Sequence, residues 1–166
     1  PWRKAWGRIG LVVLASYVGV AAVCRGTVEA SVREAQAQGQ LPPGAVSVLP
    51  QPPWLGSWAA FIDADGSTWA GPMKVRSSDT SRLVSYRAPT PDAQLETALA
   101  TPAARRFLDF ARFPHVTRVD HGEDAWFDLQ DLRFALSGWE RSNWWYGVRI
   151  EVDREGVVRY AGFANP

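Results

Sequence analysis

The chain begins with one continuous apolar stretch. Residues 9–24 carry no charged side chain, and Arg8 and Arg25 bracket them. These sixteen residues would cover about 24 Å as a helix, slightly less than the roughly 30 Å of a bilayer's hydrocarbon core. The flanks can supply the rest, because the two tryptophans before the stretch suit the headgroup region and both arginines can extend towards water. The pattern therefore predicts a membrane-spanning helix over residues 5–28.

Two other interpretations of this stretch stay open. A basic start followed by a short apolar run is also typical of a secretory signal peptide. The residues before Cys24 do not form a lipoprotein cleavage pattern, because Ala21 and Val23 stand where leucine and a small residue are needed. The second alternative is a core helix of a soluble protein, which can have the same length and apolarity.

The basic residues around the stretch predict its orientation. Arg3, Lys4 and Arg8 precede it, whereas Arg25 alone follows it closely. Under the positive-inside rule the N-terminus then lies in the cytoplasm. We therefore expect a protein of the bacterial inner membrane whose residues after 25 face the periplasm.

Helical periodicity continues beyond the apolar stretch. Val28, Val32 and Ala35 fall on one stripe of a helix, which predicts a helical stalk. Gly39 and the Pro-Pro-Gly of residues 42–44 should end that stalk, since proline cannot continue the hydrogen-bond ladder. We expect two domains: residues 1–41 as transmembrane helix and stalk, and residues 42–166 as a soluble α+β domain.

The second part of the chain has the pattern of short strands separated by turns. A proline-rich lead-in over residues 42–53 should lie extended over the domain. Residues 57–63 and 67–75 predict a hairpin, because Asp65 and Gly66 suit a tight turn between them. A further short strand is predicted over residues 82–87.

A helical excursion interrupts the strands. Apolar residues recur at helical spacing over residues 91–112, and Thr101 followed by Pro102 predicts a break with a new helix start. Strand patterns then return, the clearest being the strict alternation from Tyr146 to Val152. The remaining predicted strands cover residues 116–119, 125–129, 132–136 and 157–163. The predicted fold is α+β: an N-terminal transmembrane helix and stalk, then an antiparallel meander sheet with one helical excursion.

Composition excludes some functions. Eighteen Lys and Arg against seventeen Asp and Glu give a net charge of +1, so we expect no nucleic-acid partner. A single cysteine, Cys24, cannot form an internal disulfide or anchor a multi-cysteine zinc site. Nine tryptophans in 166 residues exceed ordinary use, and such rings fill cores or lie at membrane surfaces.

The sequence offers one cluster with metal-donor side chains. His115 and His121 lie near Asp120, but a spacing of six matches neither one helix face nor adjacent positions on one strand face. The alternative is a polar strand end followed by a hairpin turn at residues 121–124. We therefore predict no catalytic residue and no metal ligand here, and name His115, His121 and Asp120 only as the residues to examine.

Two further groups combine aromatic and charged side chains. Trp139, Trp144, Trp145 and Tyr146 could form a ligand-stacking surface, a bilayer contact or ordinary core. Strand alternation would place Asp131 and Arg133 on one face and Leu132 and Phe134 on the other. That charged pair, which Arg112 could join, is expected to define the fold and not to catalyse a reaction.

A set of motif residues follows the proline-rich entry in a fixed order: Trp58, Arg112, Phe113, Pro114, Asp131, Leu132 and Arg133. Together with the last membrane helix, the stalk and the proline-rich entry, this order resembles the C-terminal half of the YdjM-like inner-membrane proteins, a family of membrane-bound metal-dependent hydrolases. The resemblance covers nearly the whole chain.

The resemblance implies that the metal-binding His and Asp residues belong to an upstream membrane half, which this chain lacks. No catalytic residue can therefore be assigned to this chain, and any divalent metal would be held upstream. The chain starts with Pro1 and not methionine, so we expect a processed product or a piece of a longer one.

Two functions follow as expectations. The first is the membrane-anchored, extracytoplasmic portion of a metal-dependent hydrolase, itself structural or substrate-positioning, with the bilayer and the upstream helices as partners. The alternative is a non-enzymatic envelope module that binds a partner or small ligand through the aromatic surface near residues 139–146.

Overall fold

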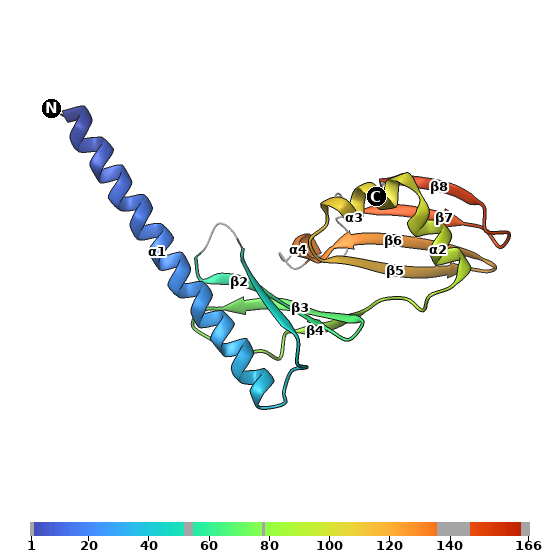
Figure 1. The fold of residues 1–166 in the computed structure, drawn as a ribbon, viewed down its shortest axis with the longest axis horizontal. Coiled ribbons are helices and arrows are strands. Elements are labelled where there is room, and N and C mark those ends of the chain that lie inside the picture. The colour runs from blue at the N-terminus through green and yellow to red at the C-terminus, as the bar shows by residue number, and fades with distance from the viewer. Residues whose placement is uncertain (1, 52–54, 78, 136–146, 164–166) are drawn as a thin grey trace. The chain divides into compact units, whose positions relative to one another are not determined.

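The computed structural model describes residues 2–51, 55–77, 79–135 and 147–163 (Figure 1). It confirms an α+β chain in which a long N-terminal apolar helix precedes antiparallel sheets. Within these described residues the strands form two sheets of four strands each, where the sequence predicted one meander. The chain divides into two compact units, the first with residues 1–64 and 71–84 and the second with residues 65–70 and 85–166.

Helix α1 (Trp2–Ala37) is continuous from the apolar stretch into the predicted stalk. Its end is set by Gly39, whose φ of 71° lies in the left-handed region that glycine adopts without strain. The Gly39 amide donates to the Gln36 carbonyl at 3.0 Å, and the Gln40 amide donates to the Ala35 carbonyl at 2.9 Å. These two bonds form a Schellman motif, which satisfies carbonyls that the last turn would otherwise leave unpaired.

The first sheet follows α1 in the order β1-β2-β3-β4, with β1 (Ala45–Pro50), β2 (Ser57–Ala64), β3 (Ser67–Lys74) and β4 (Val84–Arg87). β1 and β2 pair antiparallel from Ala45 opposite Asp63 to Pro50 opposite Trp58. The predicted hairpin is present, and its turn residues Asp65 and Gly66 have φ of 31° and 75°.

Strand β1 lies in the segment that the sequence predicted only as an extended lead-in. The many prolines of this segment argued against a strand, because proline has no backbone N–H to donate to a neighbouring strand. The stretch from Ala45 to Pro50 nevertheless pairs with β2 along its whole length, with Val48 buried. The flanking prolines limit the strand's length and do not prevent it.

The second unit holds the second sheet, in the order β5-β6-β7-β8. The antiparallel strands are β5 (Pro114–His121), β6 (Asp124–Asp131), β7 (Val148–Val152) and β8 (Val158–Phe163). Between β4 and β5 the chain makes the predicted excursion, as α2 (Ala93–Ala100) and α3 (Pro102–Phe110). The Thr101 hydroxyl accepts a hydrogen bond from the Ala104 amide at 3.2 Å, which confirms the predicted cap before Pro102.

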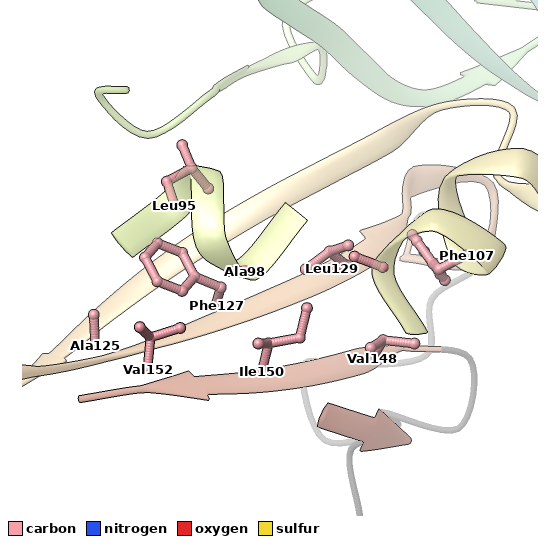
Figure 2. Close-up of a cluster of buried hydrophobic side chains, with 10 residues drawn as sticks. Leu95, Ala98, Phe107, Ala125, Phe127, Leu129, Val148, Ile150 and Val152 are labelled. Atoms are coloured by element: carbon pink, nitrogen blue, oxygen red, sulfur yellow. The ribbon is translucent and has the colours of Figure 1, made fainter. Parts of the chain in front are cut away.

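The two helices cover one face of the second sheet (Figure 2). Alternate residues of β6 and β7 point towards them, so the strict alternation read from the sequence is the buried pattern of β7. The buried residues of this core are Leu95, Ala98, Ala104, Phe107, Ala125, Phe127, Leu129, Val148, Ile150 and Val152.

The predicted strand over residues 132–136 is wrong. Residues Leu132–Ala135 form a single helical turn, α4, and residue 136 lies outside the described residues. The cause is Asp131, whose Oδ1 accepts a hydrogen bond from the Arg133 amide at 3.0 Å. A carboxylate that bonds an amide two residues on favours a helix start over continued extension.

Candidate functional site

Residues 6–23 of α1 are mostly apolar, and their large side chains are exposed on every side of the helix. The exposed fractions of its large side chains range from 50% at Val20 to 70% at Val23. A helix on a soluble domain normally exposes one polar face and buries one apolar stripe. The exposed side chains here are Trp6, Ile9, Leu11, Val12, Val13, Leu14, Tyr17, Val18, Val20 and Val23.

One helix among the described residues is long and apolar enough to cross a membrane. It covers Trp6–Ala37, with a mean hydropathy of 1.8 over its most apolar window, none of which is buried. The last third of the same helix is different, because Val28 and Val32 are almost wholly buried against the first sheet. The large apolar side chains of α1 are therefore exposed up to Val23, whereas Val28 and Val32 are buried in the core of the first unit.

Polar contacts attach the end of α1 to the first unit. The Gln36 Nε2 donates to the Pro42 carbonyl at 2.8 Å and to the Gly44 carbonyl at 3.3 Å. Glu29 and Arg33 pair at 2.7 Å, one turn apart on the helix surface. The stalk is thus an integral part of the first unit.

Trp58 is buried in the core of the first unit. Its side chain is 3% exposed, and its Nε1 donates to the Leu55 carbonyl at 2.7 Å. A buried indole whose N–H is bonded acts as a packing anchor.

Asp131 lies at the centre of the Arg-Phe-Pro and Asp-Leu-Arg elements of residues 112–114 and 131–133. Its carboxylate is buried and accepts the Arg133 Nε at 2.8 Å and the Arg112 amide at 2.9 Å. The Arg133 Nη2 also lies 2.6 Å from Asp131 Oδ2. Burial alone would raise the pKa of Asp131, but these hydrogen bonds hold it below the usual value. Arg112 therefore joins the pair through its backbone and not through its guanidinium.

The other motif residues surround this ion pair. Leu132 is buried, and its amide donates to the Phe113 carbonyl at 3.0 Å. Pro114 begins β5 directly opposite Asp131. The Arg-Phe-Pro and Asp-Leu-Arg elements therefore meet in space, at the point where β5 begins and β6 ends.

The two histidines do not form a site together. His115 and His121 lie at opposite ends of β5, so their spacing along the strand is about 20 Å. His115 contacts the edge of the Tyr86 ring, and burial lowers its pKa. His121 stacks on Trp126 with ring centroids 4.0 Å apart, and Asp120 pairs with Arg118 at 2.6 Å. Within the described ranges, no three or more His, Cys, Asp or Glu side chains are placed to hold a metal.

Sequence reasoning missed the ion pair of Asp128 and Arg149. Asp128 is 1% exposed, and its two oxygens accept the Arg149 Nε at 2.7 Å and Nη2 at 3.0 Å. Asp128 lies directly opposite Arg149 in the pairing of β6 and β7, and the guanidinium lies 4.7 Å from the Trp126 ring centroid. The hydrogen bonds to Asp128 raise the pKa of Arg149. The alternation of β7 could have placed Arg149 on the face opposite the core. Identifying Asp128 as its partner required the register of β6 and β7, which the sequence does not give.

A charged hollow lies at the other end of the second sheet. Asp153 accepts the amides of Val157 at 2.8 Å and Glu155 at 3.0 Å, which lowers its pKa, and it pairs with Arg159 at 2.6 Å. Arg154 pairs with Glu123 at 2.9 Å. The hollow is lined by Glu123, Asp124, Asp153, Arg154, Glu155 and Arg159. The contact of Arg154 with Glu123 connects the turn between β7 and β8 to the turn between β5 and β6.

The predicted aromatic surface of Trp139, Trp144, Trp145 and Tyr146 lies outside the described residues. Comparisons with known protein families, with curated proteins and with solved structures gave no match to this chain. The resemblance to YdjM-like proteins therefore stays a prediction.

Proposed function

We propose that this chain is the membrane-anchored, extracytoplasmic portion of a YdjM-like, membrane-bound metal-dependent hydrolase of the bacterial inner membrane. Residues after 25 lie in the periplasm in this proposal. The chain's own part is structural or substrate-positioning, and the divalent metal and its ligands belong to membrane helices upstream of Pro1.

One observation carries the proposal: α1 exposes an apolar surface on all sides and then enters the core of the first unit without a break. Exposing about ten large apolar side chains to water is unfavourable, and burial in lipid removes that cost. A core helix of a soluble protein would bury this window, whereas none of it is buried. The unbroken helix also favours a retained anchor, because a cleaved signal peptide would have no reason to continue into packed structure.

The charged side chains of the second unit support a structural or substrate-positioning role for this chain. Asp131 and Asp128 are held by arginines, and Asp153 is held by two turn amides and Arg159. The lowered pKa values of Asp131 and Asp153 keep these two carboxylates ionised at neutral pH, which suits scaffolding and opposes general-acid chemistry. The metal-dependent step of the proposal is therefore assigned to the upstream half.

A topology experiment tests the membrane part of the proposal. Alkaline phosphatase, which is active only in the periplasm, and a fluorescent protein that matures only in the cytoplasm are each fused after Pro166. We expect phosphatase activity and no fluorescence. Replacing Arg3, Lys4 and Arg8 with glutamine should lower the phosphatase activity, because the positive-inside bias is lost. Fluorescence without phosphatase activity contradicts the proposed orientation.

A metal-binding experiment tests the hydrolase part. The chain alone and the chain joined to its upstream reading frame are purified in detergent and analysed for bound zinc and manganese. We expect stoichiometric metal only with the upstream part. Stoichiometric metal on the chain alone that is lost in H115A/H121A contradicts the proposal. An upstream frame without further membrane spans would favour the alternative, an anchored envelope module without enzymatic activity.

A further inference from the structure

We infer that the second unit docks on the bilayer surface through one end, which we call the phenylalanine end. It consists of Phe110, Phe134 and Phe163 together with Arg105, Arg106 and Arg112. The proposed partner is an anionic lipid surface. This inference rests on the proposed membrane anchorage of α1.

Strand register and two contacts of Arg133 place the three phenylalanines at one end of the unit. Phe163 lies opposite Val148 in the pairing of β8 and β7, at the start of β7. Arg133 lies two residues after the end of β6, and its guanidinium lies 5.4 Å from the centre of the Phe110 ring and 5.2 Å from the centre of the Phe134 ring. The hairpin turns of the sheet lie at the opposite end, about 25 Å away along eight-residue strands.

The phenylalanine rings of this end are presented to solvent. Phe163 is 76% exposed and Phe110 is 63% exposed, while Phe134 is 38% exposed. Arg133 lies between Phe110 and Phe134, and the buried Asp131 fixes Arg133 in turn. Two rings are thus held in place by a buried ion pair. A preorganised apolar surface binds at a lower entropic cost than a flexible one.

The charges around these rings fit an anionic membrane. Arg105, Arg106 and Arg112 are all exposed, and within residues 102–114 Asp109 is the one acidic residue. Arg106 lies one helical turn before Phe110, so cation and ring share a face of α3. Arginine can bind lipid phosphates with two parallel hydrogen bonds while adjacent aromatic rings enter the headgroup region.

The opposite end has the reverse charge. Its hollow is lined by four carboxylates and two arginines. An anionic surface repels this end and attracts the phenylalanine end, which gives the unit one preferred orientation. The tether through α1 keeps the unit close to the bilayer, so a contact of low intrinsic affinity is populated. The Arg-Phe-Pro and Asp-Leu-Arg motifs would then build a membrane-facing surface.

A depth-dependent quenching experiment tests this inference on the full chain. Cys24 is replaced with serine, and single cysteines at Val18, Asp109 or Glu155 carry a bimane fluorophore. The protein is reconstituted in vesicles of phosphatidylcholine with phosphatidylglycerol, with and without brominated lipid as quencher. Val18 reports the anchor, Asp109 the phenylalanine end and Glu155 the opposite end.

We expect brominated lipid to reduce fluorescence at Val18 and Asp109 but not at Glu155. The loss at Asp109 should weaken at 1 M salt or without phosphatidylglycerol, since the Debye length falls from about 10 Å at 0.1 M salt to about 3 Å. The variant F110S/F163S should abolish the loss at Asp109. The control V157S, which removes an exposed apolar residue near the charged hollow, should leave it unchanged.

The three reporters separate the possible failures. No quenching at Val18 overturns the proposed anchor itself. Quenching at Val18 without quenching at Asp109, or equal quenching at Asp109 and Glu155, overturns the docking inference alone. A change in fluorescence at Asp109 that depends on the protein density in the vesicles, and not on the brominated lipid, also overturns the docking inference. Such a change would indicate contact between copies of the chain.

Discussion

The buried carboxylate of Asp131 pairs with the guanidinium of Arg133, two residues further along the chain. It also accepts a hydrogen bond from the Arg133 amide, which starts the helical turn α4. The same carboxylate accepts the amide of Arg112, which lies nineteen residues earlier in the chain. One side chain therefore joins the end of α3, the end of β6 and α4. The Arg-Phe-Pro and Asp-Leu-Arg elements therefore meet at one carboxylate.

Removing this carboxylate should destabilise the second unit. In D131A the Arg133 guanidinium and two amides lose their acceptor. Hydrogen bonds to charged groups contribute about 1.5–3 kcal/mol, and Arg133 is partly exposed, so we expect a loss of about 2–3 kcal/mol. Urea denaturation followed by tryptophan fluorescence measures the change. The control D109A removes an exposed acid of α3 and should alter the free energy of unfolding by less than about 0.5 kcal/mol.

Stability should fall in acid because of the same residue. The pKa of Asp131 is lower in the folded state than in the unfolded chain, where it is about 3.9. Its contribution is therefore complete above about pH 5 and is lost as the pH falls through the folded pKa. Denaturation midpoints between pH 2.5 and 6 should decline less steeply in D131N than in the parent chain. An identical decline in both proteins contradicts the assignment.

Much of the fold follows from local patterns in the sequence. Alternation predicted β7, the Thr101-Pro102 pair predicted the helix break, and the run of residues 9–24 predicted the apolar helix. The separation into two sheets was not predicted, because it depends on which strands pair and not on where they lie. The Asp128–Arg149 pair was missed for the same reason, since only the strand register brings the two residues together.

The α4 error has a different origin. Residues 131–134 alternate between charged and apolar side chains, which is typical of a strand. A single hydrogen bond from the Arg133 amide to Asp131 outweighs that pattern, because the segment is too short for alternation to bury much surface. The motif residues were therefore found from the sequence, whereas their shared contact with Asp131 required the structure.

A close backbone contact in the first unit makes Gly71 hard to replace. A Cβ at this position would lie 2.3 Å from the Arg82 carbonyl oxygen and 2.8 Å from its carbon. We expect G71A to lose about 1–3 kcal/mol of stability, as overpacked sites do. The control G56A meets no atom within 4 Å and should be close to neutral. Equal denaturation midpoints for G71A and G56A would show that β3 can move away from residue 82.

Docking of the stalk should contribute to the stability of the first unit. Val32 is fully buried where α1 packs on β1 and β2. V32A removes buried methyl groups, and about 1–2 kcal/mol of stability should be lost at roughly 0.8 kcal/mol per group plus the cavity term. The matched control E34A changes an exposed residue of the same helix and should have little effect. Protease resistance of the first unit in detergent gives the readout, and equal resistance of both variants contradicts the packing.

Alkaline carbonate extraction of membranes from cells expressing the full chain tests whether α1 is inserted in the bilayer. We expect the chain to remain in the membrane pellet, and V13K/V18K to release it because two charges within the apolar window oppose insertion. Recovery of the parent chain in the carbonate supernatant, as a monomer dissolved without detergent, would show that α1 is not a membrane anchor.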